Sequence, residues 1–186
     1  RKGAQNVLPF RYVAAVRAAP QFAGLLDEGL RLSVEQLPEL DGRTVIIVDV
    51  SRSMEETLSG KSDMTRMDAA CALAAFARGA KRVFSFSHKL VEVPAYPGLA
   101  GADAIRKSQD HGATNLGGAL STLYGSAEFD RIIVITDEQS ADAVPAPKGK
   151  GYMINVASAR NGVGYGPWIH IDGFSENVFR FIAARA

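Results

Sequence analysis

The hydrophobic positions follow two patterns that alternate along most of the chain. Apolar runs rich in β-branched residues, clearest at 44–50 and 131–136, predict strands buried on both faces, as in a parallel sheet. Weaker runs predict strands at 81–87, 90–93 (a candidate antiparallel companion), 152–156 and 168–171. The segments between them predict helices at 66–78, 103–109, 116–125 and after an N-cap at Ser175. This alternation indicates the α/β class, with a doubly wound, Rossmann-like, mostly parallel sheet flanked by helices.

The first 42 residues have a helical pattern instead. We predict that 1–42 form an N-terminal helical extension and that 43–186 form the α/β domain. Pro9 suits the first turn of one helix, and Pro20 interrupts that helix before a second amphipathic stretch reaches Val34. Gly79 is expected to end the helix that begins near Arg66.

The charge balance and the cysteine count exclude several classes of function. Lys and Arg number 21 and Asp and Glu 20, so the chain has no overall basic field for nucleic acid and any RNA contact must be local. A single cysteine, Cys71, excludes an intrachain disulfide and a multi-cysteine zinc site, and we expect it to be a small buried side chain. No apolar run reaches membrane-spanning length, and we expect a cytoplasmic protein. The start at Arg1 suggests a fragment of a longer chain.

Oxygen-bearing side chains cluster where the predicted strands end. Asp49, Ser51 and Ser53 are spaced at i, i+2 and i+4 just past one strand, Thr114 lies in a loop before a helix, and Asp137 follows another strand. Open α/β sheets place their sites at these carboxyl ends. Hard oxygens without His or Cys suit Mg²⁺, or another hard cation such as Mn²⁺ or Ca²⁺.

The charges of this set predict its chemistry. Two carboxylates cancel the two charges of the ion, and the hydroxyls add coordination without adding charge. The ion would therefore remain electrophilic enough to accept one more carboxylate from outside. We predict a site for an acidic side chain of a protein ligand.

The set Asp49-x-Ser51-x-Ser53, Thr114 and Asp137 resembles the metal-ion-dependent adhesion site (MIDAS) of von Willebrand factor A domains. Arg52 stands where many members of that family have a glycine, which alters the rim of the site. The resemblance implies a Rossmann-like sheet with the ion at its top, held by these five residues.

A narrower resemblance covers the whole chain. Leu8-Pro-Phe-Arg-Tyr-Val-Ala-Ala15, Asp49-Val-Ser-Arg-Ser-Met54 and Gly166-Pro-Trp-Ile-His-Ile171 are similar to the C-terminal part of Ro ribonucleoproteins, which contain a TROVE module. In that family a ring of helical repeats binds noncoding Y RNAs and misfolded RNA. The resemblance implies that 1–42 end such a helical region, that RNA binds mainly to the missing ring, and that an exoribonuclease is a candidate partner.

The candidate metal ligands also have structural interpretations that involve no metal. Asp49, Ser51 and Ser53 could form a polar turn, and Thr114 or Asp137 could N-cap a helix. His111 is a candidate for the rim of the site, and His170 is expected to be a core residue. Gly60-Lys61-Ser62 lacks the preceding glycine of a phosphate-binding loop.

Three functional hypotheses follow. The first is a non-enzymatic, divalent-metal-dependent binding module of a Ro-like protein in RNA quality control. The second is a metal-dependent phosphoester hydrolase that uses the same aspartates, although a base to activate a nucleophile and a phosphate cradle are missing from the sequence. The third is a structural A domain that closes a ring and whose metal site is idle.

Overall fold

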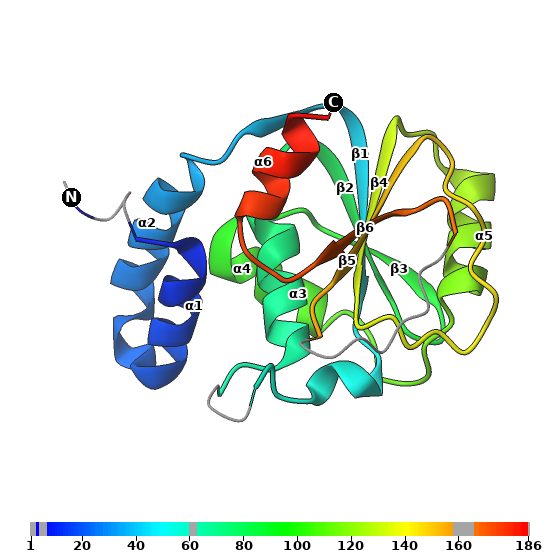
Figure 1. The fold of residues 1–186 in the computed structure, drawn as a ribbon. Coiled ribbons are helices and arrows are strands. Elements are labelled where there is room, and N and C mark those ends of the chain that lie inside the picture. Colours follow the sequence, from blue (N-terminus) through cyan, green and yellow to red (C-terminus); the bar gives the residue numbers. More distant parts are fainter. Residues whose placement is uncertain (1–2, 4–6, 60–62, 158–165, 186) are drawn as a thin grey trace.

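The computed structural model describes residues 3, 7–59, 63–157 and 166–185, and these form a six-stranded sheet between helices (Figure 1). The strands are β1 (Glu39–Asp49), β2 (Arg78–Phe86), β3 (Leu90–Val93), β4 (Arg131–Thr136), β5 (Lys150–Asn155) and β6 (Ile169–Asp172). Their order is β3-β2-β1-β4-β5-β6, and all neighbours pair in parallel except the antiparallel β2 and β3. The predicted doubly wound, mostly parallel sheet and the antiparallel 90–93 strand are confirmed.

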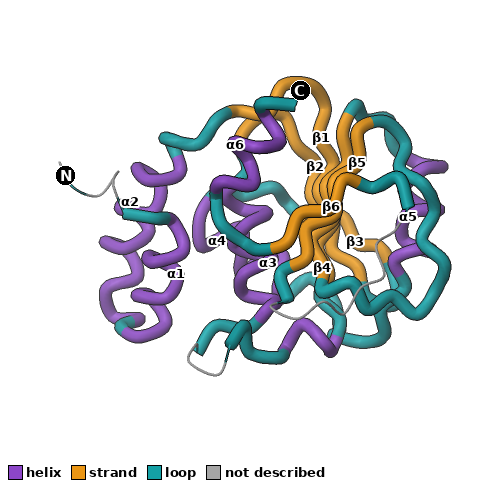
Figure 2. Tube along the Cα trace, in the orientation of Figure 1, coloured by secondary structure: helices purple, strands orange, loops and turns teal. Residues whose placement is uncertain are grey.

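Helices cover both faces of the sheet (Figures 1 and 2). One face packs against α3 (Arg66–Phe76), α4 (Gly98–Arg106) and α6 (Asn177–Ala183), and the other packs against α5 (Leu116–Ser126). The helices α1 (Pro9–Ala18) and α2 (Ala23–Val34), joined by the short turn η2 (Pro20–Phe22), lie outside α3 and α4. The N-terminal segment is helical through Val34, but β1 already begins at Glu39, inside the predicted 1–42 helical extension.

The central strand β1 contributes to both hydrophobic layers. Ile46 and Val48 belong to the larger cluster with α3 and α6, whereas Val45 and Ile47 belong to the smaller cluster with α5. All four side chains are buried, because alternate residues of a strand point to opposite faces and both faces are covered here. This burial explains the continuous apolar run that leads to Asp49 at the end of the strand.

Gly79 has a different role from the predicted one. α3 ends at Phe76, and Gly79 already lies in β2, paired with Leu40 of β1. Its φ is +107°, and a Cβ there would stand 2.4 Å from the backbone oxygen of Leu40. The glycine is needed for close approach of two strands rather than for a helix cap.

Two helix boundaries also differ from the prediction. α4 spans Gly98–Arg106 with Pro97 as its N-cap residue, so it begins and ends earlier than the predicted helix at 103–109. The N-cap residue of α6 is Glu176, while the Ser175 hydroxyl accepts a hydrogen bond from the Asn177 amide at 3.2 Å. Cys71 is buried, as predicted.

Two sequence expectations concern other parts of the chain. The segment Gly60-Lys61-Ser62 lies outside the described residues. None of the helices in the described ranges is long and apolar enough to cross a membrane.

Candidate metal centre

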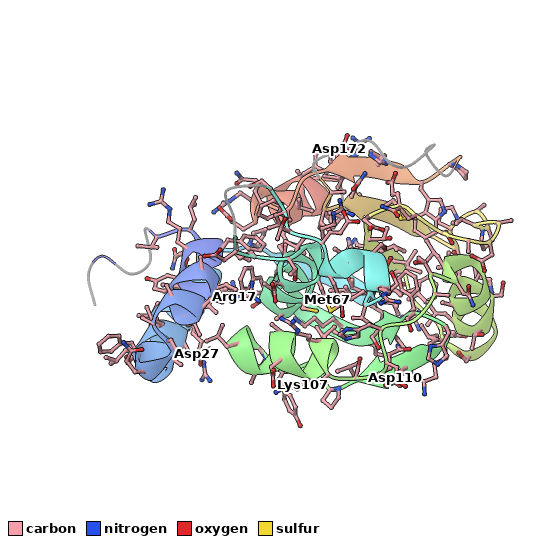
Figure 3. All side chains as sticks on the ribbon, turned by 90° about the horizontal axis from the view of Figure 1, so that it is seen from below. Arg17, Asp27, Met67, Lys107, Asp110 and Asp172 are labelled. Atoms are coloured by element: carbon pink, nitrogen blue, oxygen red, sulfur yellow. The ribbon has the colours of Figure 1, made fainter. Side chains whose placement is uncertain are left out.

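Three loops meet at the carboxyl end of the sheet, which Figure 3 views directly with Asp110 and Asp172 on opposite sides. They follow β1, precede α5 and follow β4. A hydrogen bond joins each pair of these segments. Thr136 Oγ1 at the end of β4 donates to Asp49 Oδ2 at the end of β1 (2.7 Å). The loop before α5 accepts the other two bonds, from Arg52 N–H to the Gly112 carbonyl (3.1 Å) and from Ala141 N–H to the Thr114 carbonyl (2.9 Å). The fold therefore brings the three predicted parts of the site together.

Asp49 is fully buried at the end of the central strand. Its Oδ1 accepts the Ser51 amide at 2.9 Å, and its Oδ2 accepts the Thr136 hydroxyl. Burial is the main cause that raises the pKa of this carboxyl to about 6, against these hydrogen bonds, which lower it. A buried carboxylate of this kind is stabilised by a cation.

The two serines continue from Asp49 along one turn. Ser51 precedes the short turn η3 (Arg52–Glu55), and its Oγ lies 3.3 Å from Ser53 Oγ. Ser51 is buried, and the buried Met54 anchors the turn beneath the loop. The two hydroxyls therefore converge, which matches the spacing argument from the sequence.

Asp137 is buried directly after β4. Its Oδ2 accepts a hydrogen bond from Arg66 Nη1 at 3.1 Å. Its Oδ1 is buried and has no hydrogen-bond partner within the described ranges. No described helix begins at Asp137, so the alternative N-cap interpretation is wrong.

Thr114 does not cap α5 through its side chain. The N-cap residue is Asn115, and the first amides of the helix are bound by side chains from the loop after β4. Asp142 accepts the amides of Gly117 (2.9 Å) and Gly118 (2.8 Å). The capping role considered for Thr114 therefore belongs to Asp142, and Thr114 remains at the loop junction with a nearly buried side chain.

Two features of this end were missed by the sequence analysis. Arg66, at the start of α3, reaches Asp137 across 71 positions of the chain. Glu138 is buried with φ +59°, and burial raises the pKa of its carboxyl. His170 Nδ1 lies 2.7 Å from Glu138 Oε1, and His170 Nε2 lies 2.9 Å from Asp172 Oδ1. The predicted core position of His170 is wrong, because 35% of its side chain is exposed at the edge strand β6.

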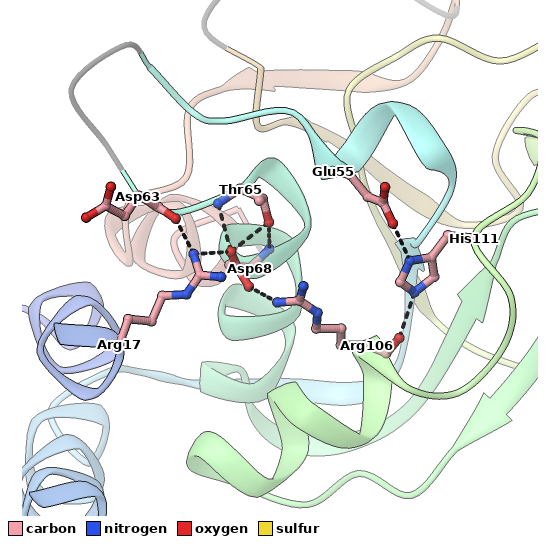
Figure 4. Close-up of polar contacts among 7 residues, drawn as sticks. All are labelled: Arg17, Glu55, Asp63, Thr65, Asp68, Arg106 and His111. Atoms are coloured by element: carbon pink, nitrogen blue, oxygen red, sulfur yellow. Dashed lines mark hydrogen bonds and ion pairs between the residues drawn. The ribbon is translucent and has the colours of Figure 1, made fainter. Parts of the chain in front are cut away.

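His111 braces two of the site loops, as Figure 4 shows. Its Nδ1 lies 2.9 Å from Glu55 Oε1 in η3, and its Nε2 lies 3.0 Å from the Arg106 carbonyl at the end of α4. The same figure shows Asp68 of α3 between Arg17 and Arg106. The loop after β1 is thus linked to α4, and α4 is linked through α3 to α1.

The residues fit a magnesium-type ion. The orphaned Asp137 Oδ1 is a buried, charged acceptor whose desolvation a cation would offset. The donors are two carboxylates and hydroxyls, which are the ligands of hard cations. Across the described part of the chain, no three His, Cys, Asp or Glu side chains gather to hold a metal, which disfavours a zinc-type cluster there.

The sequence and the structure were compared with known proteins, and only solved structures are similar to the chain. No protein-family model and no curated protein matches the sequence. Among solved structures, the Ro (RSR) protein of Deinococcus radiodurans is similar over 100% of this chain, with a TM-score of 0.69 and 17% identity. The chain has a von Willebrand factor A-like fold. It spans 45% of the length of the Deinococcus protein.

Two further solved structures are less similar to the chain. An aerotolerance-related membrane protein of Bacteroides fragilis matches 77% of this chain and 96% of its own, with a TM-score of 0.49 and 13% identity. The ArnB paralog VWA2 of Sulfolobus acidocaldarius matches 80% of this chain and 46% of its own, with a TM-score of 0.42 and 20% identity. The chain shares the fold of the matching part of the Deinococcus Ro protein, whereas these two structures are less similar to it.

Proposed function

We propose that this Ro-like A module is a non-enzymatic binding module that holds Mg²⁺ and offers it to an acidic side chain of a protein partner. The residues that would hold the ion are Asp49, Ser51, Ser53, Thr114 and Asp137. The ion would supply an electrophilic centre for the partner's carboxylate. The observation that supports this best is Asp137 Oδ1, a buried carboxylate oxygen without a hydrogen-bond partner in the described residues, beside a second buried carboxylate.

Electrostatics supports a cation there. Asp49 and Asp137 repel each other enough to raise the Asp49 pKa further, although burial is the larger cause. Arg66 pairs with only one of the two buried carboxylates, Asp137, and an ion that binds only the folded chain stabilises it by mass action. The hydroxyls of Ser51 and Ser53 complete the set without adding charge.

Calorimetric titration of Mg²⁺ tests the assignment. We expect one site in the parent and at least a 100-fold loss of affinity in Asp49→Ala, because a liganding carboxylate is removed. Asp110→Ala is the matched control, since Asp110 is an exposed acid at the same end of the sheet. Equal Mg²⁺ binding by the parent and Asp49→Ala would overturn the site.

A different substitution of Asp49 separates binding from catalysis. We propose no turnover, because a hydrolase would need a base to activate a nucleophile and no such role is evident from the residues beside Asp49. Hydrolysis of a simple phosphoester by the Mg²⁺-loaded parent, lost in Asp49→Asn, would favour the hydrolase instead.

We further propose that the module belongs to a cytoplasmic Ro-like protein whose helical region binds Y RNA and misfolded RNA, with an exoribonuclease as a candidate partner. The likeness to the Deinococcus Ro protein along the whole chain supports this context. The coding sequence before Arg1 tests it: helical repeats there would agree, and an adhesive extracellular architecture would contradict it.

A further inference from the structure

Arg66 is a buried cation beside the proposed metal centre. Only 10% of its side chain is exposed. Nη1 donates to Asp137 Oδ2 at 3.1 Å, and Nη2 lies 2.7 Å from Glu56 Oε2. The guanidinium therefore bridges a proposed metal ligand on its inner side and a second acid on its outer side.

The position of Arg66 is fixed by the start of α3. Thr65 and Asp68 form a capping box, in which the Asp68 amide donates to Thr65 Oγ1 at 3.1 Å and the Thr65 amide donates to Asp68 Oδ2 at 2.7 Å. Asp68 is held in turn by Arg17 (2.7 Å) and Arg106 (2.5 Å), as Figure 4 shows. Arg66 is the first residue after this cap, so its backbone is well anchored.

The two ion pairs of Arg66 differ in strength. Asp137 is fully buried, and breaking a buried pair is costly. The Glu56 side chain is 65% exposed, and a solvated ion pair contributes little. Glu56 stays near because its carbonyl accepts the Arg66 amide at 2.9 Å, which keeps the backbone in place whether or not the side chains pair. The outer nitrogen of Arg66 is therefore held by an exchangeable carboxylate.

We propose that Arg66 determines the specificity of the centre for acidic partners: its outer nitrogen binds the partner's carboxylate, and Glu56 is the internal acid that the partner displaces. This inference rests on the proposed metal-binding function. Asp49 and Asp137 cancel the charge of a divalent ion and Glu56 balances Arg66, so displacement of Glu56 leaves one net positive charge for the partner's carboxylate. A guanidinium fork also matches a carboxylate better than a neutral amide.

The test measures binding of an acidic peptide to the Mg²⁺-loaded chain by NMR titration. The probes are the end-blocked peptide Gly-Ser-Glu-Ser-Gly and its Gln counterpart. Glu56→Gln should bind the Glu peptide about fivefold more tightly than the parent, because an exposed internal competitor of this kind is removed. Glu55→Gln is the matched control: it removes the same charge one position away, but Glu55 contacts His111 instead of Arg66.

A second variant tests the cation itself. Arg66→Gln should discriminate less than the parent between the Glu and Gln peptides, because only the ion then favours the carboxylate, and Arg66→Lys should recover part of the lost discrimination. Mg²⁺ affinity should rise in Arg66→Gln, because a positive charge beside the ion is lost. If Arg66→Gln fails to fold, Glu56→Gln still decides, since the exposed Glu56 side chain has no role in the core.

The outcomes separate this inference from the function it rests on. If the parent does not bind Mg²⁺, the proposed function fails and the role of Arg66 fails with it. If Mg²⁺ binds but Glu56→Gln leaves peptide affinity unchanged, only the role of Arg66 is overturned. An equal gain in Glu55→Gln and Glu56→Gln would show a general charge effect and would also overturn it.

Discussion

Aspartate side chains have opposite environments at the two ends of the mostly parallel sheet. At the carboxyl end, Asp49 is buried and burial raises the pKa of its carboxyl to about 6. At the amino end, Asp130 is exposed and hydrogen bonds from Arg43 lower its pKa. The first carboxylate is costly to the folded chain, whereas the second is satisfied by a neighbour on β1.

Polar groups near these two aspartates also differ in how many of them have hydrogen-bond or ion-pair partners. At the amino end, Arg43 pairs with both Glu128 and Asp130. Arg131 Nη1 donates to the Asp41 carbonyl at 2.8 Å. The Nε atom of Arg131 is buried without a partner in the described residues. At the carboxyl end, Asp137 Oδ1 and Glu138 Oε2 are buried without a hydrogen-bond partner in the described residues, while Glu138 Oε1 lies 2.7 Å from His170 Nδ1. The amino end serves the stability of the fold, and the carboxyl end retains charge that a ligand can use.

The largest effect on stability is expected from Gly79→Ala, at the amino end of the sheet. The substitution would strain a φ of +107° and press a methyl group against the Leu40 backbone. We expect a loss of about 3 kcal/mol or more in the free energy of unfolding, measured by urea denaturation. Mg²⁺ affinity of the folded variant should equal that of the parent, because the strain lies far from the site.

Gly24→Ala provides the control for that substitution. Gly24 lies in α2, and a Cβ there would meet nothing within 4 Å. The variant should be as stable as the parent or slightly more stable, because alanine restricts the unfolded chain. If Gly79→Ala were as mild as Gly24→Ala, the close packing of β1 and β2 would not govern stability at this end.

The next test replaces an aspartate at each end by asparagine. Asp49→Asn should stabilise the metal-free chain by about 1–3 kcal/mol at pH 8, because it removes a buried charge and keeps the side-chain shape. Asp130→Asn should destabilise it, because Arg43 loses an ionic partner. Thermal unfolding in a chelator measures both, and changes of the same sign would show that the two ends do not differ as described.

The sequence was sufficient for features that depend on local pattern. The β-branched run through Val48 predicted the central strand, and the spacing of Asp49, Ser51 and Ser53 predicted a shared site because all three follow that strand directly. Gly79 was misassigned, because a glycine after a helical pattern resembles a C-cap until its pairing with Leu40 is known.

Features that depend on contacts between distant segments were not predictable. Arg66 begins an alanine-rich helix and has no local signal that it reaches Asp137 on another loop. Glu138 and His170 come from different strands, and an apolar strand pattern around His170 wrongly favoured burial. The grouping of the candidate ligands at one end of the sheet could thus be predicted, whereas the charges around them required the fold.

The smallest expected effect is a dependence on pH confined to the carboxyl end. Asp49 has a folded-state pKa of about 6, above its ordinary value of 3.8. Between these values the folded chain binds a proton that the unfolded chain does not. The metal-free parent should therefore gain stability relative to Asp49→Asn as the pH falls below 6, by about 1.4 kcal/mol per pH unit at most.

Mg²⁺ binding should show the reverse trend, because the ion competes with that proton. Its affinity should fall by about tenfold per pH unit below pH 6 and stay nearly constant above pH 7. Comparing the parent with Asp49→Asn at each pH cancels the titration of Glu138 and of Asp130. A stability difference between the two that does not change from pH 7 to pH 5 would show that Asp49 is not the buried, protonatable carboxylate that distinguishes this end of the sheet.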